Sequence, residues 1–287
     1  MINFMCAPNK FGGNWTGDKL NIFIRYLDAY LIALKNQSFK LIYIDAFAGS
    51  GGILTSDNEL LDGSAVQALS ARYKFDHYYF VEKDPKNVQN LKEKIKSKFP
   101  NLEERITVYC GDANYYLELI VNSIDWNTTR GLLFLDPYAT QLHWSILPKI
   151  ASTGAIDVWY LFPLGALNRM LANDHINEKD GDCIDRLLGD KKWRDELYRD
   201  NPQLSLFDNS EQDKKDVNKV RKADQNELIA CILTRLKSVF PCVSEHPRIF
   251  RNSKNAALFL FCFAISNPSY KAQGLAKKIA NHILKKN

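Results

Sequence analysis

Along this chain, segments in which hydrophobic residues have helical spacing alternate with short apolar runs that are typical of strands. Within residues 17–36 they recur every three or four positions, a spacing that predicts an amphipathic helix, and Thr16 or Asp18 is expected to cap it. Residues 40–44 are then predicted to form a short buried strand, because residues 41–44 are a continuous apolar run. That run ends at Asp45, just ahead of a cluster of glycines.

The same alternation continues as far as residue 162. Further helices are predicted over residues 63–73, 85–99, 114–121 and 144–150, and further strands over residues 77–81, 105–109, 132–135 and 156–162. Strands that alternate with helices are typical of a parallel sheet covered by helices on both faces. The predicted fold class is therefore α/β, with a Rossmann-like, mostly parallel sheet flanked by helices.

One polar stretch interrupts the pattern. Residues 173–224 are rich in Asp, Asn, Lys and Arg and contain few aliphatic residues. We predict that they form an inserted helical or loop segment. The insertion would divide a single Rossmann-like domain into two parts, residues 1–172 and residues 225–287.

The last part of the chain returns to regular spacing. A helix is predicted over residues 225–240, and two β-like runs follow at 246–250 and 257–265. Two strands in succession, without a helix between them, predict an antiparallel pair at the end of the sheet. A basic helix is predicted from Ala272 onwards.

The composition is that of an ordinary globular protein. Of the 287 residues, 46% are hydrophobic and 25% charged, which argues against disorder, collagen and coiled coil. The longest apolar runs, such as 256–265, are shorter than the ~20 residues that span a bilayer, and residues 1–14 lack the layout of a signal peptide. We expect a cytoplasmic protein without membrane contact. The six cysteines are scattered, which predicts neither a disulfide framework nor a metal site.

The C-terminal region is strongly basic. No acidic residue follows Glu245, and the region's charge of +8 comes from Arg248, Arg251, Lys254, Lys271, Lys277, Lys278, Lys285 and Lys286. Because the whole chain carries +5, residues 1–245 carry −3. A basic region on a slightly acidic body favours contact with a polyanion such as nucleic acid. A solvated, lysine-rich helix end explains the same charge without any partner.

Candidate chemistry begins directly after the first predicted strand, with the sequence Asp45-Ala46-Phe47-Ala48-Gly49-Ser50-Gly51-Gly52. Glycines let a ligand approach the backbone, and ligands of open α/β sheets bind at the carboxyl ends of the strands. The GxGxxG dinucleotide pattern is incomplete here, and the Gly-Lys-Ser/Thr of a P-loop is absent. A purely structural glycine turn remains an alternative.

Acidic residues follow the next two predicted strands. Glu82, followed by Lys83, is placed to accept hydrogen bonds from the hydroxyls of a ribose, while Asp84, just before a proline, is expected to cap the next helix. Asp112, followed by Ala113, is placed to accept a hydrogen bond from an adenine amino group. A helix-capping role is the alternative for Asp112 as well.

A fourth group, Asp136-Pro137-Tyr138, ends the strand predicted over residues 132–135. Asp136 and the carbonyl of Pro137 can accept hydrogen bonds from an exocyclic amine, and Tyr138 can stack on a planar base. These three residues are the candidate catalytic set. An ordinary Asp-Pro turn is the alternative. His143 nearby could assist in removing a proton, although a lone histidine is more often structural.

Four such groups at successive strand ends resemble the S-adenosylmethionine site of class I methyltransferases. The resemblance implies that the glycine loop holds the methionine part, Glu82 the ribose and Asp112 the adenine. The residues that it assigns to cofactor binding are Asp45, Phe47, Ala48, Gly49, Ser50, Gly51, Glu82, Lys83, Asp112 and Ala113. The late antiparallel strand pair also suits the last two strands of that family.

A narrower resemblance is to the three-Cys-motif partner protein (TcmP) family. It is carried by Trp15-Thr16 with Lys19, Tyr43-Ile44-Asp45-Ala46-Phe47-Ala48-Gly49, Phe80-Val81-Glu82 and Leu135-Asp136-Pro137-Tyr138. It covers most of the chain apart from residues 173–224. It implies a methyltransferase-like protein that acts with a separate protein bearing a three-Cys motif.

These observations predict an S-adenosylmethionine-dependent methyltransferase that acts on an amino nitrogen, with a nucleic-acid base as one candidate acceptor. The chain departs from the Asp/Asn-Pro-Pro-aromatic motif of adenine methyltransferases, because a single proline stands between Asp136 and Tyr138. That departure leaves open a non-catalytic, cofactor-binding partner of a three-Cys-motif protein. A nucleotide-dependent oxidoreductase is a third reading, which the incomplete GxGxxG pattern disfavours.

Overall fold

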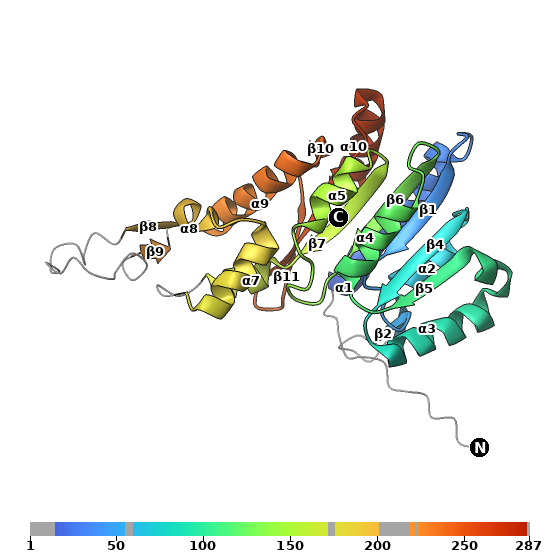
Figure 1. Ribbon diagram of the computed structural model, residues 1–287, viewed down its shortest axis with the longest axis horizontal. Helices are drawn as coiled ribbons and strands as arrows, with labels where there is room; N and C mark the ends of the chain where they lie inside the picture. Colours follow the sequence, from blue (N-terminus) through green and yellow to red (C-terminus); the bar gives the residue numbers. More distant parts are fainter. Residues whose placement is uncertain (1–14, 55–59, 172–175, 201–218, 222, 286–287) are drawn as a thin grey trace, which may run out of the picture.

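The computed structural model describes residues 15–54, 60–171, 176–200, 219–221 and 223–285 of the chain. Their central feature is an eight-stranded sheet with the order β10-β12-β7-β6-β1-β4-β5, in which β11 also pairs with β12 (Figure 1). Its strands are β1 (Lys40–Asp45), β4 (His77–Glu82), β5 (Ile106–Cys110), β6 (Thr129–Leu135), β7 (Ile156–Phe162), β10 (Cys242–Val243), β11 (Arg248–Arg251) and β12 (Ala257–Ile265).

The chain builds this sheet in two directions from β1. It passes to β4 and β5 on one side and then returns to β6 and β7 on the other, with every one of these pairings parallel. β12 is antiparallel to β7 and carries β10 and β11, also antiparallel, on its other edge. The predicted fold class and the late antiparallel strands are thereby confirmed. The reversal at β1 leaves a crevice beyond the carboxyl ends of the parallel strands.

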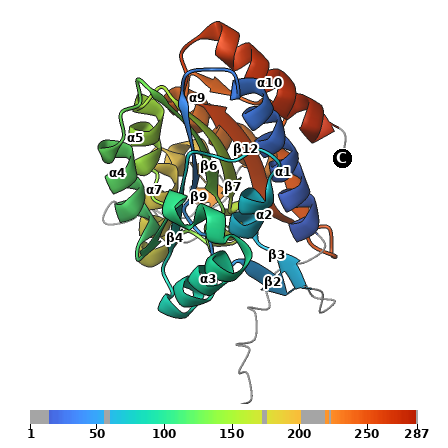
Figure 2. The same cartoon turned by 90° about the vertical axis from the view of Figure 1, so that its right-hand side faces the viewer.

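Two layers of helices cover the sheet, because alternate residues of each strand face opposite sides. Leu41 and Tyr43 pack into one core, and Ile42 and Ile44 into the other. The first core contains α1 (Trp15–Leu34), α2 (Ser64–Ser70), α3 (Pro85–Lys98) and α10 (Tyr270–Lys285). The second contains α4 (Ala113–Ser123), α5 (Ile146–Ser152), α6 (Leu164–Met170), α7 (Glu178–Leu188) and α9 (Gln225–Val239). Figure 2 shows the sheet between these layers.

The predicted helices and strands are present, with ends that shift by a few residues. One cap was wrong: α1 already begins at Trp15, so Thr16 and Asp18 lie inside its first turn. Several short elements escaped prediction because they carry too few periodic residues. They are the hairpin β2 (Gly52–Leu54) and β3 (Leu60–Asp62), the 3-10 helix η1 (Pro100–Arg105), α6 and β10. Among the described helices, none has the length and apolar character needed to cross a membrane.

The described part of the polar segment 173–224 forms α7, α8 (Trp193–Glu196), β8 (Tyr198–Asp200) and β9 (Lys219–Arg221). Ile184 and Leu187 of α7 and Trp193 of α8 are at most 1% exposed and belong to the core that also contains β6 and β7. Residues 173–175, 201–218 and 222 of this segment lie outside the described residues. The division into one domain with an insertion stays a prediction.

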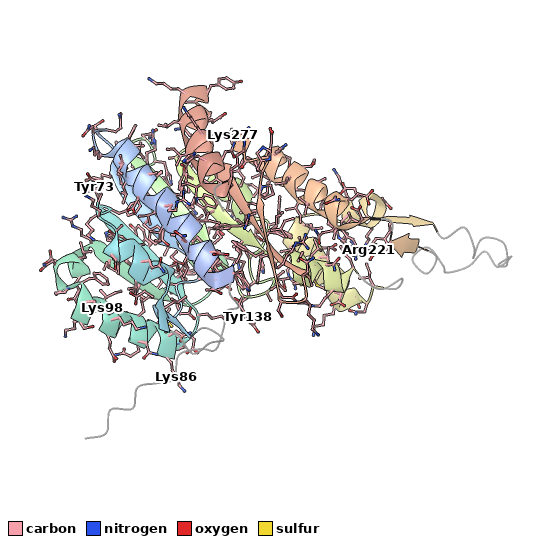
Figure 3. All side chains as sticks on the ribbon, turned by 180° about the vertical axis from the view of Figure 1, so that it is seen from behind. Tyr73, Lys86, Lys98, Tyr138, Arg221 and Lys277 are labelled. Atoms are coloured by element: carbon pink, nitrogen blue, oxygen red, sulfur yellow. The ribbon has the colours of Figure 1, made fainter. Side chains whose placement is uncertain are left out.

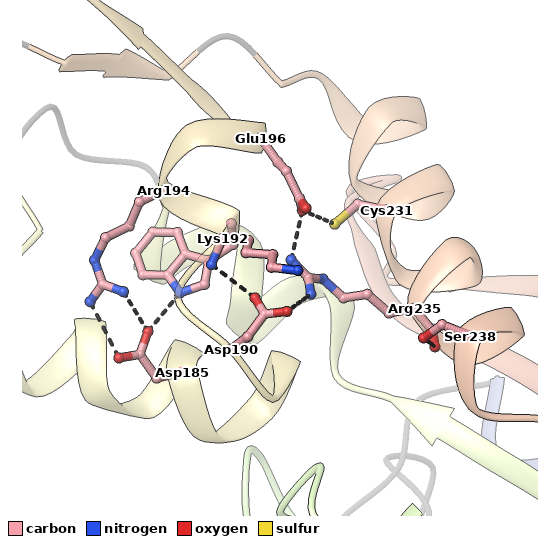
Figure 4. Close-up of polar contacts among 9 residues, drawn as sticks. Asp185, Asp190, Lys192, Arg194, Glu196, Cys231, Arg235 and Ser238 are labelled. Atoms are coloured by element: carbon pink, nitrogen blue, oxygen red, sulfur yellow. Dashed lines mark hydrogen bonds and ion pairs between the residues drawn. The ribbon is translucent and has the colours of Figure 1, made fainter. Parts of the chain in front are cut away.

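A buried arginine ties this segment to α9 (Figure 4). The guanidinium of Arg235 donates hydrogen bonds to Asp190 at 2.7 Å and to Glu196 at 2.6 Å, and its side chain is only 10% exposed. Asp185 accepts further bonds from the Trp193 indole at 2.7 Å and from Arg194 at 2.6 Å. Charged groups therefore supplement the apolar contacts that hold α8 against α9.

Arg235→Met should lower the free energy of unfolding by about 1–3 kcal/mol. The substitution leaves Asp190 and Glu196 without their partly buried partner, which destabilises the fold. Because both carboxylates are partly exposed, water limits the loss of stability. Urea denaturation measures the loss. Lys237→Met is the control, because Lys237 is an exposed cation on the same helix and no described residue forms an ion pair with it. Equal destabilisation by the two variants would contradict a locking role for Arg235.

Candidate functional site

A cavity of about 750 Å³ lies beyond the carboxyl ends of β1, β4, β5 and β6, where the direction of the sheet reverses. Its lining includes every residue that the sequence predicted for the site except Asp45 and the candidate for proton removal, His143. These are Phe47, Ala48, Gly49, Ser50, Gly51, Glu82, Lys83, Asp112, Ala113, Asp136, Pro137 and Tyr138. Four segments that are far apart in the sequence therefore meet at one cavity, because the carboxyl ends of parallel strands share one edge of the sheet.

The glycine turn after β1 is held by the carboxylate of Glu82. Gly49 and Gly51 have φ angles of +61° and +71°, in the left-handed region that favours glycine. One oxygen of Glu82 accepts a hydrogen bond from the Gly49 amide at 2.9 Å, and the other accepts one from the Asp84 amide at 2.7 Å. Glu82 therefore fixes the positions of two loops that line the cavity.

Asp45 lies beneath the cavity and does not line it, so its assignment to cofactor binding stays a prediction. Its side chain is fully buried and accepts hydrogen bonds from the Ser64 hydroxyl at 2.6 Å, the Phe47 amide at 3.1 Å and the Tyr43 hydroxyl at 3.3 Å. Burial raises the pKa of Asp45 to about 6. The carboxyl supports the glycine turn from the core, on the same side of β1 as Tyr43.

Asp112 caps α4 and also lines the cavity, while its contact with an adenine amine stays a prediction. Its Oδ1 accepts hydrogen bonds from the amides of Asn114 at 2.9 Å and Tyr115 at 3.2 Å. The Asn114 side chain then reaches the loop after β6, where it donates to the Gln141 carbonyl at 2.9 Å and accepts from the His143 amide at 2.8 Å. The His143 side chain is exposed and is not part of the lining, so the geometry does not support a role for it in removing a proton from the acceptor.

Asp136 forms an ion pair with Lys19, which sequence reasoning did not single out as a functional residue. The Lys19 side chain is only 3% exposed, and its ammonium lies 5.2 Å from the centroid of the Trp15 ring. Lys19 lies four residues before Phe23, so helical spacing already puts it on the buried face of α1. A lysine on an apolar face needs an acidic partner, and that was the missed signal.

The residues after Asp136 turn sharply toward solvent. Tyr138 is 64% exposed and lies beside the N-terminal end of α1 (Figure 3), and Ala139 takes a left-handed φ of +52°. The loop then meets α7: the Thr140 hydroxyl lies 3.0 Å from the Cys183 sulfur, and the Trp144 amide donates to the Arg186 carbonyl at 2.8 Å. α4 and α7 thus support this loop from two sides.

The cavity extends past Asp136 into a second part, which we call the α6 half. It is lined by Trp15, Thr16, Pro163, Ala166, Arg169, Leu258 and Phe259. These residues come from the start of α1, from α6 and from the start of β12. Except for Trp15 and Thr16, none stood in a motif of the sequence, because α6 was not predicted and β12 was recognised only as an apolar run.

Comparison with known proteins finds likeness in structure only. No family description matches the sequence, and no curated protein matches it. Protein LPL1258 from Legionella pneumophila, described under the family name DUF519, has 13% sequence identity and a TM-score of 0.49, with 91% of this chain and 90% of that chain covered. An O-methyltransferase from Bacillus cereus in complex with SAH has 12% identity and a TM-score of 0.39, with 85% and 80% covered. Spermidine synthase from Thermotoga maritima has 8% identity and a TM-score of 0.40, with 91% and 62% covered.

Gly51→Ala should destabilise the protein more than Gly49→Ala. Both substitutions put alanine at a left-handed φ, which costs about 1–2 kcal/mol. At Gly51 the new methyl group would also lie 3.0 Å from side-chain carbons of Leu91 and Val66, whereas no atom lies within 4 Å of it at Gly49. Overpacking should add about 1 kcal/mol at Gly51, measured by urea denaturation. Equal losses would show that the turn can move away from the core.

The stability that Asp45 contributes should depend on pH. Its pKa rises from 3.8 to about 6 on folding, so the folded protein binds this proton more tightly than the unfolded chain. The free energy of unfolding should therefore fall as the pH rises from about 4 to about 6, and Asp45→Asn should remove that fall. The asparagine can keep the bonds to Phe47 and Ser64. Urea denaturation of both proteins across this range tests the expectation, and a pH-independent difference between them would contradict it.

Proposed function

We propose that this protein is an S-adenosylmethionine-dependent methyltransferase that acts on an amino nitrogen. One observation carries the proposal: a single cavity gathers the glycine turn, Glu82, Asp112 and Asp136-Pro137-Tyr138 at four strand ends. The glycine turn, Glu82 and Asp112 follow one another along the chain in the order in which the methionine part, the ribose and the adenine are joined in such a cofactor. A volume of about 750 Å³ falls within the range typical of small-molecule sites.

The residues present fit the cofactor. The space where a Cβ of Gly49 would stand is open, so a ligand can approach the backbone there. Each oxygen of Glu82 accepts one amide, and a carboxylate can accept about four hydrogen bonds, which leaves capacity for two ribose hydroxyls. Asp112 uses only Oδ1 in its bonds to described residues, so Oδ2 can accept a bond from an adenine amine.

A cofactor held by the glycine turn, Glu82 and Asp112 would supply an electrophilic methyl group, with the thioether as the leaving group and water to take up the amine proton. The protein needs to position and desolvate the acceptor. Lys19 holds Asp136 through Oδ2, which leaves Oδ1 and the Pro137 carbonyl to accept bonds from the amine. A neutral amine needs no strong base before it attacks, which agrees with the exposed position of His143.

The ion pair between Lys19 and Asp136 also favours a second candidate. It occupies part of the acceptor capacity of Asp136, and the single proline departs from the motif of adenine methyltransferases. A protein that binds the cofactor without transferring the methyl group, as the partner of a three-Cys-motif protein, would keep the glycine turn and Glu82 but would not need Asp136 to accept an amine.

Asp136→Ala and Glu82→Ala should separate cofactor binding from transfer. Glu82→Ala should weaken S-adenosylhomocysteine binding by about 1–3 kcal/mol, the scale of hydrogen bonds to a charged group. Asp136→Ala should leave that affinity within a few-fold and abolish transfer from tritiated S-adenosylmethionine to a mixture of DNA, tRNA, rRNA and total protein. Glu104→Ala, on the exposed surface of η1, is the control for both measurements.

Calorimetry decides between the candidates. No binding of S-adenosylmethionine or S-adenosylhomocysteine at about millimolar concentration, which corresponds to less than ~4 kcal/mol, would overturn the proposed function. Binding without transfer to any acceptor class would favour the non-catalytic partner. An Asp136→Ala variant with full activity would remove Asp136 from the mechanism.

A further inference from the structure

The α6 half of the cavity offers a stacking surface. The ring centroids of Trp15 and Phe259 lie 4.8 Å apart, and Phe250 lies 5.9 Å from Trp15. Pro163 and Ala166 extend this apolar lining. Aromatic rings beside a cavity favour planar ligands, whose faces they can cover.

A buried hydroxyl in the same lining has no hydrogen-bond partner. Thr16 is 2% exposed, and its Oγ1 makes no hydrogen bond with any residue that the structure describes. Leaving a buried polar group unpaired destabilises the fold, which is why such groups are rare. Because α1 begins at Trp15, its first turn holds Thr16 against the cavity. Since Thr16 lines the α6 half, a polar ligand atom there is a candidate partner for this hydroxyl.

A cation lies beside these groups. Arg169 of α6 lines the cavity and is exposed, and no described residue bonds its guanidinium. Its neighbour Asn168 accepts a hydrogen bond from Arg221 at 2.8 Å, which brings a second guanidinium to this end of α6. A guanidinium binds phosphate through two parallel hydrogen bonds, so this lining favours an anionic ligand.

Positive charge continues outside the cavity. Arg251 at the end of β11 and Lys254 in the turn that follows are exposed. They lie next to the start of β12, whose Leu258 and Phe259 line the α6 half. Arg251 donates one bond to the Asn255 carbonyl at 3.0 Å and keeps its other donors. Lys277 of α10, in contrast, lies at the opposite end of the molecule from Tyr138 (Figure 3).

We propose that the α6 half binds one nucleotide unit of a single nucleic-acid strand. The inference rests on the proposed function, which places an amine beside Asp136. A nucleotide combines the required features in one unit: a planar base to stack on Trp15 and Phe259, an exocyclic amine, and a phosphate for Arg169. Thr16 bonds an edge of the base or the sugar.

The exposed cations outside the cavity, Arg251 and Lys254, are the reason for proposing a strand instead of a single free nucleotide. Phosphates on either side of the bound nucleotide lie within reach of Arg251 and Lys254, so a strand gains contacts that a free nucleotide lacks. A base within a duplex would first have to leave the stack to enter the cavity, and single-stranded nucleic acid avoids that cost.

The test uses the full chain with and without saturating S-adenosylhomocysteine. Fluorescence anisotropy measures binding of short single-stranded DNA and RNA of mixed sequence, and competition with AMP and CMP measures binding of the free nucleotide. Arg169→Gln should weaken strand binding roughly 10-fold, the scale of one bond to a charged group, and lower the salt dependence by about one phosphate contact. Thr16→Val should weaken strand binding roughly 3- to 10-fold, the scale of one hydrogen bond.

Two controls separate this site from general effects. Thr16→Val removes an unpaired buried hydroxyl, so it should unfold at a urea concentration no lower than the original protein, whereas a structural role for Thr16 predicts a loss of stability. Lys277→Gln removes a half-buried cation that pairs with Glu245 at 3.5 Å and lies far from Tyr138 (Figure 3). It should change strand binding less than 2-fold, within the range of a distant screened charge.

Each outcome decides the proposal. Strand binding that Arg169→Gln and Thr16→Val both weaken, with unchanged affinity for S-adenosylhomocysteine, supports it. No strand binding overturns it, and so does binding that only Lys277→Gln weakens. If AMP or CMP binds as tightly as a strand does, the proposal of a strand is overturned and a free nucleotide is the ligand. Failure of S-adenosylhomocysteine to bind overturns the proposed function instead, and strand binding is still measured without it.

Discussion

Lys19 has only 3% of its side chain exposed, and its ammonium pairs with Asp136 at the tip of β6. A buried ammonium is costly unless an opposite charge accompanies it, so this pair fixes where the start of α1 lies relative to the end of β6. Phe23 of α1 continues the contact below, with its ring centroid 4.3 Å from that of Phe134 in β6. Through this constraint Trp15 and Thr16 line the cavity.

Two strand-end carboxylates, Glu82 and Asp112, hold neighbouring segments in place and also line the cavity. Glu82 holds the glycine turn and the start of α3 with one oxygen each, and Asp112 caps α4 with a single oxygen. Because a carboxylate has more lone pairs than these bonds use, the same groups stay available to the cavity. Asp45 is the exception, since it is buried, bonds to Tyr43 and Ser64, and does not line the cavity.

The late antiparallel strands complete one side of the sheet, and one of them, β12, also lines the cavity. β12 runs opposite to β7, so its first residues lie at the same edge as the last residues of the parallel strands. Leu258 and Phe259 reach the α6 half for this reason. The described part of the polar segment adds support from the other side, where α7 contacts the loop that follows Asp136.

Apolar spacing is enough to predict the order of helices and strands, because it reflects which faces each element buries. That order also predicts that Glu82, Asp112 and Asp136 meet, because the carboxyl ends of parallel strands share one edge. The folded molecule was needed to find the partner of Asp136, the inward position of Asp45, and the places of Thr16 and Arg169 in the cavity lining. Those depend on where α1 and α6 begin and on which direction each side chain takes, and packing between elements distant in the chain sets both.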